Sequence, residues 1–489
     1  MLNSKLYNLV VKSPLEKADK LSALAIADVY LKREDLQEVH SFKIRGAYNK
    51  MLSLTDSERT AGVIAASAGN HAQGVALSAK KLGIKAVIVM PKTTPEIKVS
   101  AVLGYGAEVV LHGDNYSEAQ EKCNELIKTT GMTFVHPFDD ELVIEGQGTI
   151  GTEILEQLPG LTHVFVCVGG GGMLAGIAKA IKAINPKVKI ISVEPVDSNA
   201  MQASVNAGRL VELNHVGIFA DGVAVKRVGQ NTFDIARTLV DDFITVSIDE
   251  ICAGIKYIYE DTRSIVEPAG ALGGAGLMTY KLPKNSKVVA ICSGANMSFE
   301  RLQFIAERTL VGSGREALYS VEMPETAGAL RTFCREVVNG HSISEFNYRK
   351  NGSKNAHILL GINIAGPKDK LQLENNMAEH GYKYIDFTLD ETAKDHIRHM
   401  IGGSSNSAKN EIFYNINFPE RPKALQDFLN AVSDKYNISL FHYRSLGGDI
   451  GRVLIGFECD KPKELETTLK SIGYEAEKAT SKTIDIFLK

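Results

Sequence analysis

Short apolar runs alternate with helix-length amphipathic segments from about residue 60 onward, and this alternation leaves little choice of fold. Val63–Ala66 and Ala86–Met90 are predicted strands. Between them, Asn70–Leu82 carries small or apolar residues at helical spacing, and Gly83 can cap that helix. The pattern recurs with predicted strands at 108–111, 133–136, 163–168 and 189–193. Strands separated by helices indicate parallel α/β sheets, so ligands are expected at the carboxyl ends of strands.

The sequence pattern changes near residue 315, where a duplicated segment begins. The segments 323–334 and 418–429 share residues in a constant register at an offset of 95, and the same offset places FNYR on FHYR. Each copy is predicted as strand, helix, strand, strand, helix, strand, which is a ferredoxin-like arrangement. We predict a core at 1–315 with a small subdomain at about 36–140, modules at 316–400 and 411–489, and a polar linker at 401–410.

Charge and hydropathy exclude several classes of partner. The 55 Lys and Arg residues nearly balance the 58 Asp and Glu residues, leaving a formal charge of -3. No long-range field therefore attracts nucleic acid or an anionic membrane, and a small-molecule ligand is expected. No apolar stretch reaches the ~18 residues of a membrane span, and the N-terminal segment lacks an apolar core of signal-peptide length. We expect a cytoplasmic protein.

Lys43 is the first candidate catalytic residue. Apolar side chains at 44, 47, 48, 51 and 52 define one helix face and place Lys43 at the first turn of that helix. The helix N-terminus and the like charge of Arg45 both favour the neutral, nucleophilic amine. A solvated lysine at a helix start is the alternative.

Two turns that follow predicted strands carry further candidates. SAGNH at 67–71 opens the helix of the first strand-helix unit, and backbone N–H groups at such a turn suit a carboxylate. Asn70 in this turn can contact a ligand or cap the helix. Ser293 follows the apolar run 288–292 and is either a ligand contact or an ordinary turn residue.

Four consecutive glycines, 169–172, join a predicted strand to a predicted helix. Without side chains, their backbone N–H groups can surround a phosphate at the helix N-terminus. NAD is a competing ligand, because Gly170, Gly172 and Ala175 satisfy GxGxxA and Glu194 ends the next strand where a ribose-binding acid would stand. Against NAD, the glycine loop falls in about the fifth strand-helix unit and not in the first.

The four segments together resemble the fold-type II pyridoxal phosphate (PLP) enzymes. Within that group, the chain is similar over nearly its whole length to the threonine deaminase (threonine ammonia-lyase) family, through HSFKIRGAY, ASAGNHAQGVA, VGGGGMLAG, GVAVKR, EPAGALG, SGAN and SLFHYRS. The resemblance implies a catalytic core of two parallel-sheet α/β subdomains followed by two ACT-like α+β modules. Met173 stands where the family more often has Leu, which affects packing behind the glycine loop.

The same resemblance implies roles for individual residues. Lys43 would be the Schiff-base lysine for PLP and the base that removes the α-proton of the substrate. Asn70 would bond the ring hydroxyl oxygen of PLP, and Ser293 would face its pyridine nitrogen. The phosphate group would be held by Gly169, Gly170, Gly171, Gly172 and Met173. The substrate carboxylate would be held by Ser67, Gly69 and His71.

The implied reaction is the α,β-elimination of L-threonine to 2-oxobutanoate and ammonia, the committed step of isoleucine biosynthesis, with L-serine as a secondary substrate. A neutral serine at the ring nitrogen suits elimination better than transamination, which a carboxylate there would favour. No step requires a metal, and the histidines show no paired spacing of the HExxH kind.

The duplicated module resembles ACT-like amino-acid sensors, which implies feedback inhibition by isoleucine and opposition by valine. The resemblance of the whole chain to the family implies a homotetramer. Tyr348 and Tyr443 are equivalent under the repeat and are candidates for effector contact. Leu425 and Leu454 are candidate apolar neighbours of such a site. Packing of the two tyrosines within the sheet of each module is the alternative.

Three other classes of function compete with the PLP lyase. One is an NAD-linked oxidoreductase that uses the glycine loop and Glu194. Another is a non-catalytic amino-acid-binding regulator, although such a protein has no reason to retain Lys43 beside a phosphate loop. The third is a related PLP enzyme, a serine dehydratase or serine racemase, but those families usually lack the duplicated C-terminal module.

Overall fold

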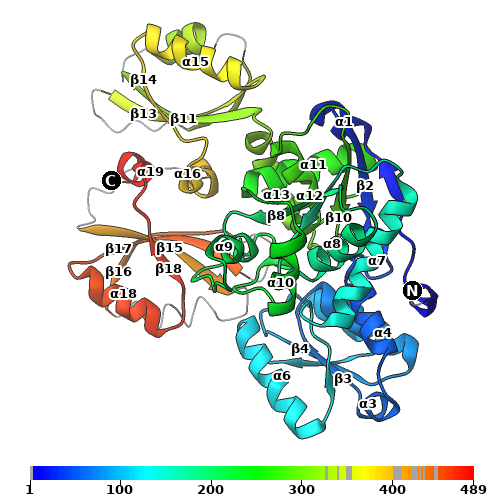
Figure 1. Ribbon diagram of the computed structural model, residues 1–489. Coiled ribbons are helices and arrows are strands. Elements are labelled where there is room, and N and C mark those ends of the chain that lie inside the picture. The colour runs from blue at the N-terminus through cyan, green and yellow to red at the C-terminus, as the bar shows by residue number, and fades with distance from the viewer. Residues whose placement is uncertain are drawn as a thin grey trace. The chain divides into compact units, whose positions relative to one another are not determined.

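The computed structural model describes residues 4–488 apart from 325–328, 339–340, 348–354, 400–409, 420–427, 429–430, 433–434 and 445–449. The chain divides into two compact units, Met1–Ile305 and Ala306–Lys489. Figure 1 colours the first unit from blue to green and the second from yellow-green to red. Within the described ranges, no helix is both long and apolar enough to cross a membrane.

The larger sheet of the first unit has six strands in the order β1-β2-β10-β7-β8-β9. Neighbouring strands from β2 to β9 are parallel, and the short edge strand β1 is antiparallel to β2. Strands β7, β8 and β10 are rich in apolar residues and almost wholly buried, as expected for a parallel sheet with both faces covered. The strands are β1 Leu15–Lys17, β2 Asp28–Arg33, β7 His163–Cys167, β8 Lys189–Pro195, β9 Asp242–Val246 and β10 Lys287–Cys292.

The smaller sheet has four parallel strands in the order β5-β4-β3-β6. Its strands are β3 Val63–Ala66, β4 Ala86–Met90, β5 Glu108–Leu111 and β6 Thr133–Phe134. The predicted strand at 133–136 is therefore wrong at its end. His136 Nδ1 accepts hydrogen bonds from the backbone N–H groups of Phe138 and Asp139, which turns the chain away from the sheet.

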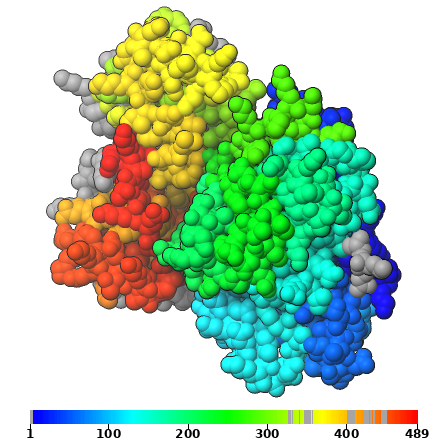
Figure 2. Space-filling view, viewed as in Figure 1, coloured from blue at the N-terminus to red at the C-terminus, as the bar shows by residue number. Residues whose placement is uncertain are grey.

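Helices connect and cover both sheets, as the alternating pattern predicts. In the space-filling view of Figure 2, the cyan helix α6 lies at the surface of the small subdomain. The helices of the first unit are η1 Ser4–Asn8, α1 Asp19–Ala25, η2 Glu34–Leu36, α2 Lys43–Leu52, α3 Asp56–Ala61, α4 Asn70–Leu82, α5 Glu96–Gly104, α6 Tyr116–Thr130, α7 Glu141–Gln157, α8 Gly172–Ile184, α9 Ala200–Ala207, η3 Asp221–Val223, α10 Gln230–Leu239, α11 Ile248–Thr262, α12 Pro268–Thr279 and α13 Arg301–Gly312, which runs into the second unit.

Helix α2 packs against α7 almost backbone to backbone. A Cβ atom on Gly46 would lie 2.4 Å from Nε2 of Gln147, and one on Gly146 would lie 2.5 Å from the carbonyl oxygen of Arg45. Contacts this short exclude any side chain at either position. The pair of glycines therefore fixes the position of α2, whose first residue is Lys43.

The second unit contains two antiparallel four-stranded sheets with equivalent strand orders, β12-β13-β11-β14 and β16-β17-β15-β18. This confirms the predicted duplication of an α+β module with ferredoxin-like connections. The first module contains β11 Glu316–Pro324, α14 Ala329–Phe333, η4 Cys334–Val338, β12 Ile343–Asn347, β13 Asn355–Asn363, α15 Pro367–Glu379 and β14 Lys383–Asp386, and is followed by α16 Glu391–Asp395 and η5 Ile397–His399. The second contains β15 Glu411–Pro419, β16 Asn437–Arg444, β17 Ile450–Glu458, α18 Pro462–Ser471 and β18 Ala476–Lys478, and is followed by α19 Lys482–Phe487.

An apolar cluster joins the two modules within the second unit. Leu318 and Leu359 from the first module share it with Phe413 and Leu454 from the second. Each of these side chains is at most 2% exposed. The unit therefore has a common core in addition to the core of each module.

Two of the four candidate effector residues, Tyr348 and Leu425, lie outside the described residues. Tyr443 lies in β16, where it is the register partner of Val453 in β17. Leu454 is fully buried in the cluster shared by the two modules. Contact of these residues with an effector stays a prediction.

Candidate active site

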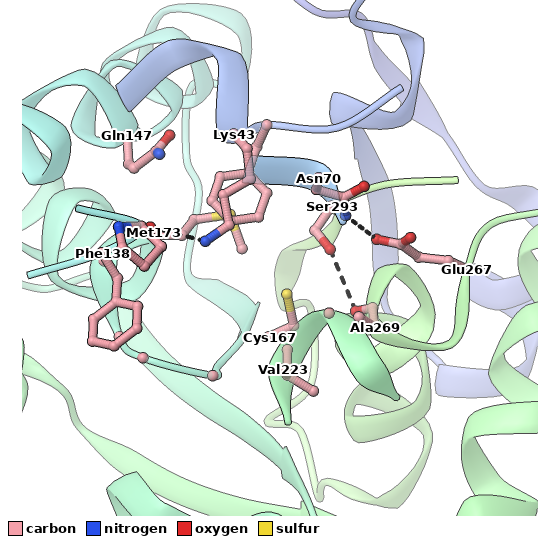
Figure 3. Close-up of a pocket in the computed structure, with 17 residues that line it drawn as sticks. Lys43, Asn70, Phe138, Gln147, Cys167, Met173, Val223, Glu267, Ala269 and Ser293 are labelled. Carbon is pink, nitrogen blue, oxygen red and sulfur yellow. Dashed lines mark hydrogen bonds between the residues drawn. The ribbon is translucent and has the colours of Figure 1, made fainter. Parts of the chain in front are cut away.

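The first unit contains a cavity to which the predicted cofactor residues all contribute. Lys43, Asn70, Ser293, Met173 and the glycines 169–172 line it. Figure 3 shows Lys43, Asn70 and Ser293 gathered around this space from different parts of the chain. Lys43 begins α2, Asn70 begins α4, the glycines lie between β7 and α8, and Ser293 follows β10. The site thus forms where strands of both sheets end, as expected for parallel α/β sheets.

The side chain of Lys43 extends into the cavity, where its Nζ donates a hydrogen bond to the carbonyl oxygen of Pro137 at 2.9 Å. Burial lowers the pKa of Lys43 to about 8, against smaller opposing effects of Cys167 and Glu267. The predicted direction of this shift is correct, but its predicted cause differs, because burial in the cavity dominates. The amine is therefore far more often neutral near pH 8 than that of an exposed lysine.

Arg45 belongs to a buried network of charges and not to the site. Its Nε donates to Oε2 of Glu34 at 2.7 Å, and its Nη1 donates to Oε1 of Glu153 at 2.6 Å. Lys32 Nζ donates to the other oxygen of Glu153 at 2.7 Å. The four side chains are at most 2% exposed. The network links α2 to η2, α7 and β2, and so holds the helix that carries Lys43.

The glycine loop is shaped to present backbone N–H groups. Gly170 accepts a hydrogen bond through its carbonyl oxygen from Thr232 Oγ1 at 2.7 Å. Because the peptide is trans, the N–H of Gly171 points the opposite way from that carbonyl. A Cβ atom on Gly170 would lie 2.2 Å from the ring of Phe138, so any side chain there would force the loop or the ring to move. The N-terminus of α8 follows at once, and this combination fits a phosphate group.

Asn70 does not cap its helix. The N-cap of α4 is Gly69, and no side chain caps this end. Asn70 Nδ2 instead donates to Oε1 of Glu267 at 2.6 Å, and its Oδ1 accepts a hydrogen bond from Asn296 Nδ2 at 2.6 Å. Of the two interpretations open for Asn70, the structure therefore favours contact within the cavity.

Ser293 is 2% exposed, and its hydroxyl lies 3.4 Å from the carbonyl oxygen of Ala269, to which it donates a hydrogen bond. The hydroxyl carries no charge at neutral pH, so the group offered to a ligand at this side of the cavity is neutral.

The three predicted substrate-binding residues lie in the turn before α4 and at its start. Ser67 Oγ accepts a hydrogen bond from the N–H of Gly69 at 3.2 Å, which holds the turn. The imidazole of His71 is 3% exposed, and its Nε2 lies 2.7 Å from the carbonyl oxygen of Val135. Burial lowers the pKa of His71 to about 3, so the ring is neutral. Any contact of His71 with a carboxylate therefore falls to its backbone N–H at the helix N-terminus.

Three other residues that line the cavity were not predicted from the sequence as site residues. Glu267 and Cys167 line the site, and burial raises the pKa of the Glu267 carboxyl to about 7 and of the Cys167 thiol to about 11. Gln147 also lines it, and its Oε1 is buried with no hydrogen-bond partner in the described part of the chain, as happens where a ligand completes a site. An acid directly before a proline at the first position of an apolar helix was the available signal for Glu267.

Glu194 is not placed to bind a ribose. Its carboxylate accepts hydrogen bonds from the backbone N–H groups of Met201 and Gln202, both at 2.8 Å, and so satisfies the first turn of α9. The side chain is 1% exposed. The carboxylate of Glu194, which supported the NAD interpretation, is therefore already bound to backbone N–H groups of α9.

Comparison with known proteins agrees with this geometry. Residues 6–294 match a family model described as "Pyridoxal-phosphate dependent enzyme", and residues 307–397 and 402–485 match "C-terminal regulatory domain of Threonine dehydratase". The chain is 46% identical to the biosynthetic L-threonine dehydratase of Escherichia coli, covering 98% of this chain and 94% of that protein. It is 47% identical to the biosynthetic threonine dehydratase of Arabidopsis thaliana chloroplasts, covering 97% and 81%.

The chain belongs to the biosynthetic threonine dehydratase family. It is therefore a PLP-dependent enzyme. The residues that line the cavity of this threonine dehydratase family member fit PLP as the cofactor. The processed form of threonine deaminase isoform 2 from Solanum lycopersicum matches with a TM-score of 0.61 and 48% identity, covering 63% of this chain and 90% of that one. Maize serine racemase matches with a TM-score of 0.59 and 33% identity, covering 63% and 95%. The match to the regulatory domain of threonine dehydratase separates the chain from the serine enzymes.

Proposed function

We propose that this chain converts L-threonine to 2-oxobutanoate and ammonia by PLP-dependent α,β-elimination in isoleucine biosynthesis, with L-serine as a secondary substrate. One observation carries the proposal. The amine of Lys43, with its pKa lowered to about 8, shares one cavity with the glycine loop, Asn70 and Ser293. The family relationship and the regulatory domain support threonine as the substrate.

Different lining residues would bind different groups of the cofactor. The glycines 169–172 and the N-terminus of α8 would hold the phosphate, because backbone N–H groups and the helix dipole favour an anion there. Asn70 would donate to the ring hydroxyl oxygen, and Ser293 would face the pyridine nitrogen. When bound, PLP accommodates the electron pair that proton removal leaves at the substrate Cα. A neutral serine at the ring nitrogen favours elimination over transamination.

Lys43 would anchor the cofactor covalently and then act as the base for the α-proton. Both roles require a neutral amine, and burial favours that form by lowering the pKa of Lys43 to about 8. The backbone N–H groups at the start of α4, next to Ser67, Gly69 and His71, would hold the substrate carboxylate.

The test is a near-ultraviolet and visible spectrum of the purified protein before and after L-threonine, with 2-oxobutanoate measured directly. We expect a visible PLP band that changes on addition of threonine, and its loss or alteration in Lys43→Ala together with activity. Lys81 is an exposed lysine in α4, and Lys81→Ala is the matched control. This variant should keep the PLP band and the activity. A colourless native protein that cannot be reconstituted with PLP would contradict the proposal.

We also propose that isoleucine inhibits this activity through the tandem modules, that valine opposes it, and that the enzyme is a homotetramer. The match of residues 307–397 and 402–485 to a regulatory domain supports this regulation. With threonine below saturation, the rate should fall as isoleucine rises toward millimolar concentration and recover with valine. A flat response to isoleucine would contradict it. Sedimentation equilibrium of the native protein measures the assembly.

A further inference from the structure

Glu267 is a buried carboxylate at the cavity that the proposed reaction does not use. It directly precedes α12, is 3% exposed and lines the site. Its Oε1 accepts a hydrogen bond of 2.6 Å from Asn70 Nδ2, drawn as a dashed line in Figure 3. A bond this short is typical of a charged acceptor. Glu267 therefore acts directly on the residue that is proposed to bond the ring hydroxyl of PLP.

A second contact fixes the other end of the Asn70 amide. Asn296 Nδ2 donates to the backbone carbonyl oxygen of Val39 at 2.7 Å and to Asn70 Oδ1 at 2.6 Å. These two bonds use both N–H groups of Asn296. The amide oxygen of Asn70 is thus held toward Asn296, and its nitrogen toward Glu267.

The donor and acceptor count leaves Asn70 one orientation. A carboxylate only accepts hydrogen bonds. If the Asn70 amide flipped, its oxygen would face the Glu267 carboxylate and its N–H groups would face those of Asn296. Both contacts would be repulsive. In the observed orientation, one N–H of Asn70 is bound to Glu267, and the second is available to the cavity that Asn70 lines.

The segment around Gly294 packs closely against Glu267. The N–H of Glu267 donates to the carbonyl oxygen of Gly294 at 3.1 Å. A Cβ atom on Gly294 would lie 2.5 Å from Oε1 of Glu267, so a glycine is required there. A Cβ atom on Gly222 would lie 3.5 Å from the same oxygen, which is an ordinary contact distance, so this loop leaves space beside the carboxyl group. The close approach of Gly294 and the bond from Asn70 therefore hold the carboxyl group in place.

Charged groups around the carboxyl group set the pH range in which it is ionised. Burial, and to a smaller extent the charge of Asp221, raise the pKa of Glu267 to about 7, against the lowering effects of the bond from Asn70 and of the charges of Lys98 and Arg301. Lys43 and Cys167 also face it. The acceptor-only form predominates above about pH 7, so the orientation of Asn70 is most strongly fixed there.

We propose that Glu267 is a positioning residue that acts through Asn70 to direct an N–H donor at the ring hydroxyl oxygen of bound PLP, and so favours the ionised form of that oxygen. The inference rests on the proposed role of Asn70 toward the cofactor. It does not depend on the substrate, because the ionisation of the ring oxygen is visible in the resting enzyme.

The experiment compares PLP-loaded native protein with Glu267→Gln, Asn70→Ala and the double variant, without substrate. A glutamine has the same shape but can donate as well as accept, so it no longer enforces one orientation of Asn70. We expect Glu267→Gln to keep PLP bound and to transfer absorbance from the longer-wavelength band of the ionised form to the shorter-wavelength band. Asn70→Ala should change the spectrum in the same direction. Glu145→Gln, an exposed glutamate in α7, should match the native spectrum.

The double variant separates positioning from an independent effect of charge. If Glu267 acts through Asn70, the double variant shows no more change than Asn70→Ala alone. Additive spectral changes, a native spectrum in Glu267→Gln, or a native spectrum in Asn70→Ala would each overturn the proposal. We further expect kcat for 2-oxobutanoate formation to fall on the order of tenfold in Glu267→Gln, with a smaller change in KM.

Asn296→Ala serves if the Glu267 variant does not fold. It keeps the carboxylate and removes the group that holds the Asn70 oxygen. The same transfer of absorbance, smaller than in Asn70→Ala, is expected. A native spectrum in both Asn296→Ala and Asn70→Ala proteins that fold and retain PLP would overturn the proposal, because the orientation of the Asn70 amide would then have no effect on the ring oxygen.

Discussion

Nζ of Lys43 donates a hydrogen bond to the carbonyl oxygen of Pro137 at 2.9 Å. The contact joins the first residue of α2 to the loop that follows β6, and it holds the amine inside the cavity. The surroundings of this amine, and not the lysine itself, decide when it is reactive.

The reaction of the apoprotein with PLP should report the lowered pKa of Lys43. Only the neutral amine attacks the aldehyde, and burial lowers the pKa to about 8. The rate should therefore rise with pH up to about 8 and then level off, whereas an ordinary lysine would gain about tenfold per pH unit to beyond pH 10. Stopped-flow absorbance measures the rate, and a free lysine derivative in the same buffers corrects for ionisation of PLP. A rise that continues unchanged to pH 10 would contradict the assignment.

Gly170→Ala should weaken cofactor binding without unfolding the protein. The new Cβ atom would lie 2.2 Å from the Phe138 ring, so the loop or the ring must move. Overpacking of this kind costs about 1–3 kcal/mol, or roughly tenfold or more in the dissociation constant of PLP if the strain falls on the loop. Gly104→Ala is the control, because a Cβ atom there meets nothing within 4 Å. Equal PLP affinity in the two variants would count against a tight loop.

Arg45→Met should strongly destabilise the catalytic unit. The change leaves the carboxylates of Glu34 and Glu153 buried with fewer partners. Breaking a buried ion pair from one side costs about 3–5 kcal/mol in the free energy of unfolding. Calorimetry and urea unfolding of the holoenzyme measure the loss. Arg237→Met removes a half-exposed pair with Asp234 and should cost less than about 1 kcal/mol. A similar loss of unfolding free energy in both variants would show that the buried network does not stabilise the unit more than an exposed ion pair does.

Leu454→Ala should destabilise the second unit while leaving threonine turnover without effector nearly unchanged. Leu454 is fully buried in the cluster shared by the two modules, and a leucine to alanine change in such a core costs about 2–5 kcal/mol. Leu389→Ala, at an 83% exposed position, is the control. Limited proteolysis and calorimetry measure the unfolding of the unit, and inhibition curves show whether isoleucine still acts. Unchanged protease resistance relative to the control would contradict the burial.

Local elements followed from the sequence where the apolar pattern was unbroken. The helix predicted at 70–82 is α4, and the strands predicted at 63–66, 86–90 and 108–111 are β3, β4 and β5. Where a local hydrogen bond competed with the sheet, the prediction was wrong by two residues, as at His136. The duplicated module was also predictable, because a repeat preserves its register of apolar and turn residues.

The sequence by itself determined which residues end strands or begin helices, and its resemblance to the PLP enzymes implied that Lys43, Asn70, the glycine loop and Ser293 share one site, which the cavity confirms. Tertiary structure alone decided how those groups behave. Glu267 meets Asn70 across 197 positions of the chain, and Arg45 joins a buried network instead of repelling Lys43. The physical reason is that burial and hydrogen-bond partners set the charge and orientation of a side chain, and both arise only when distant segments pack together.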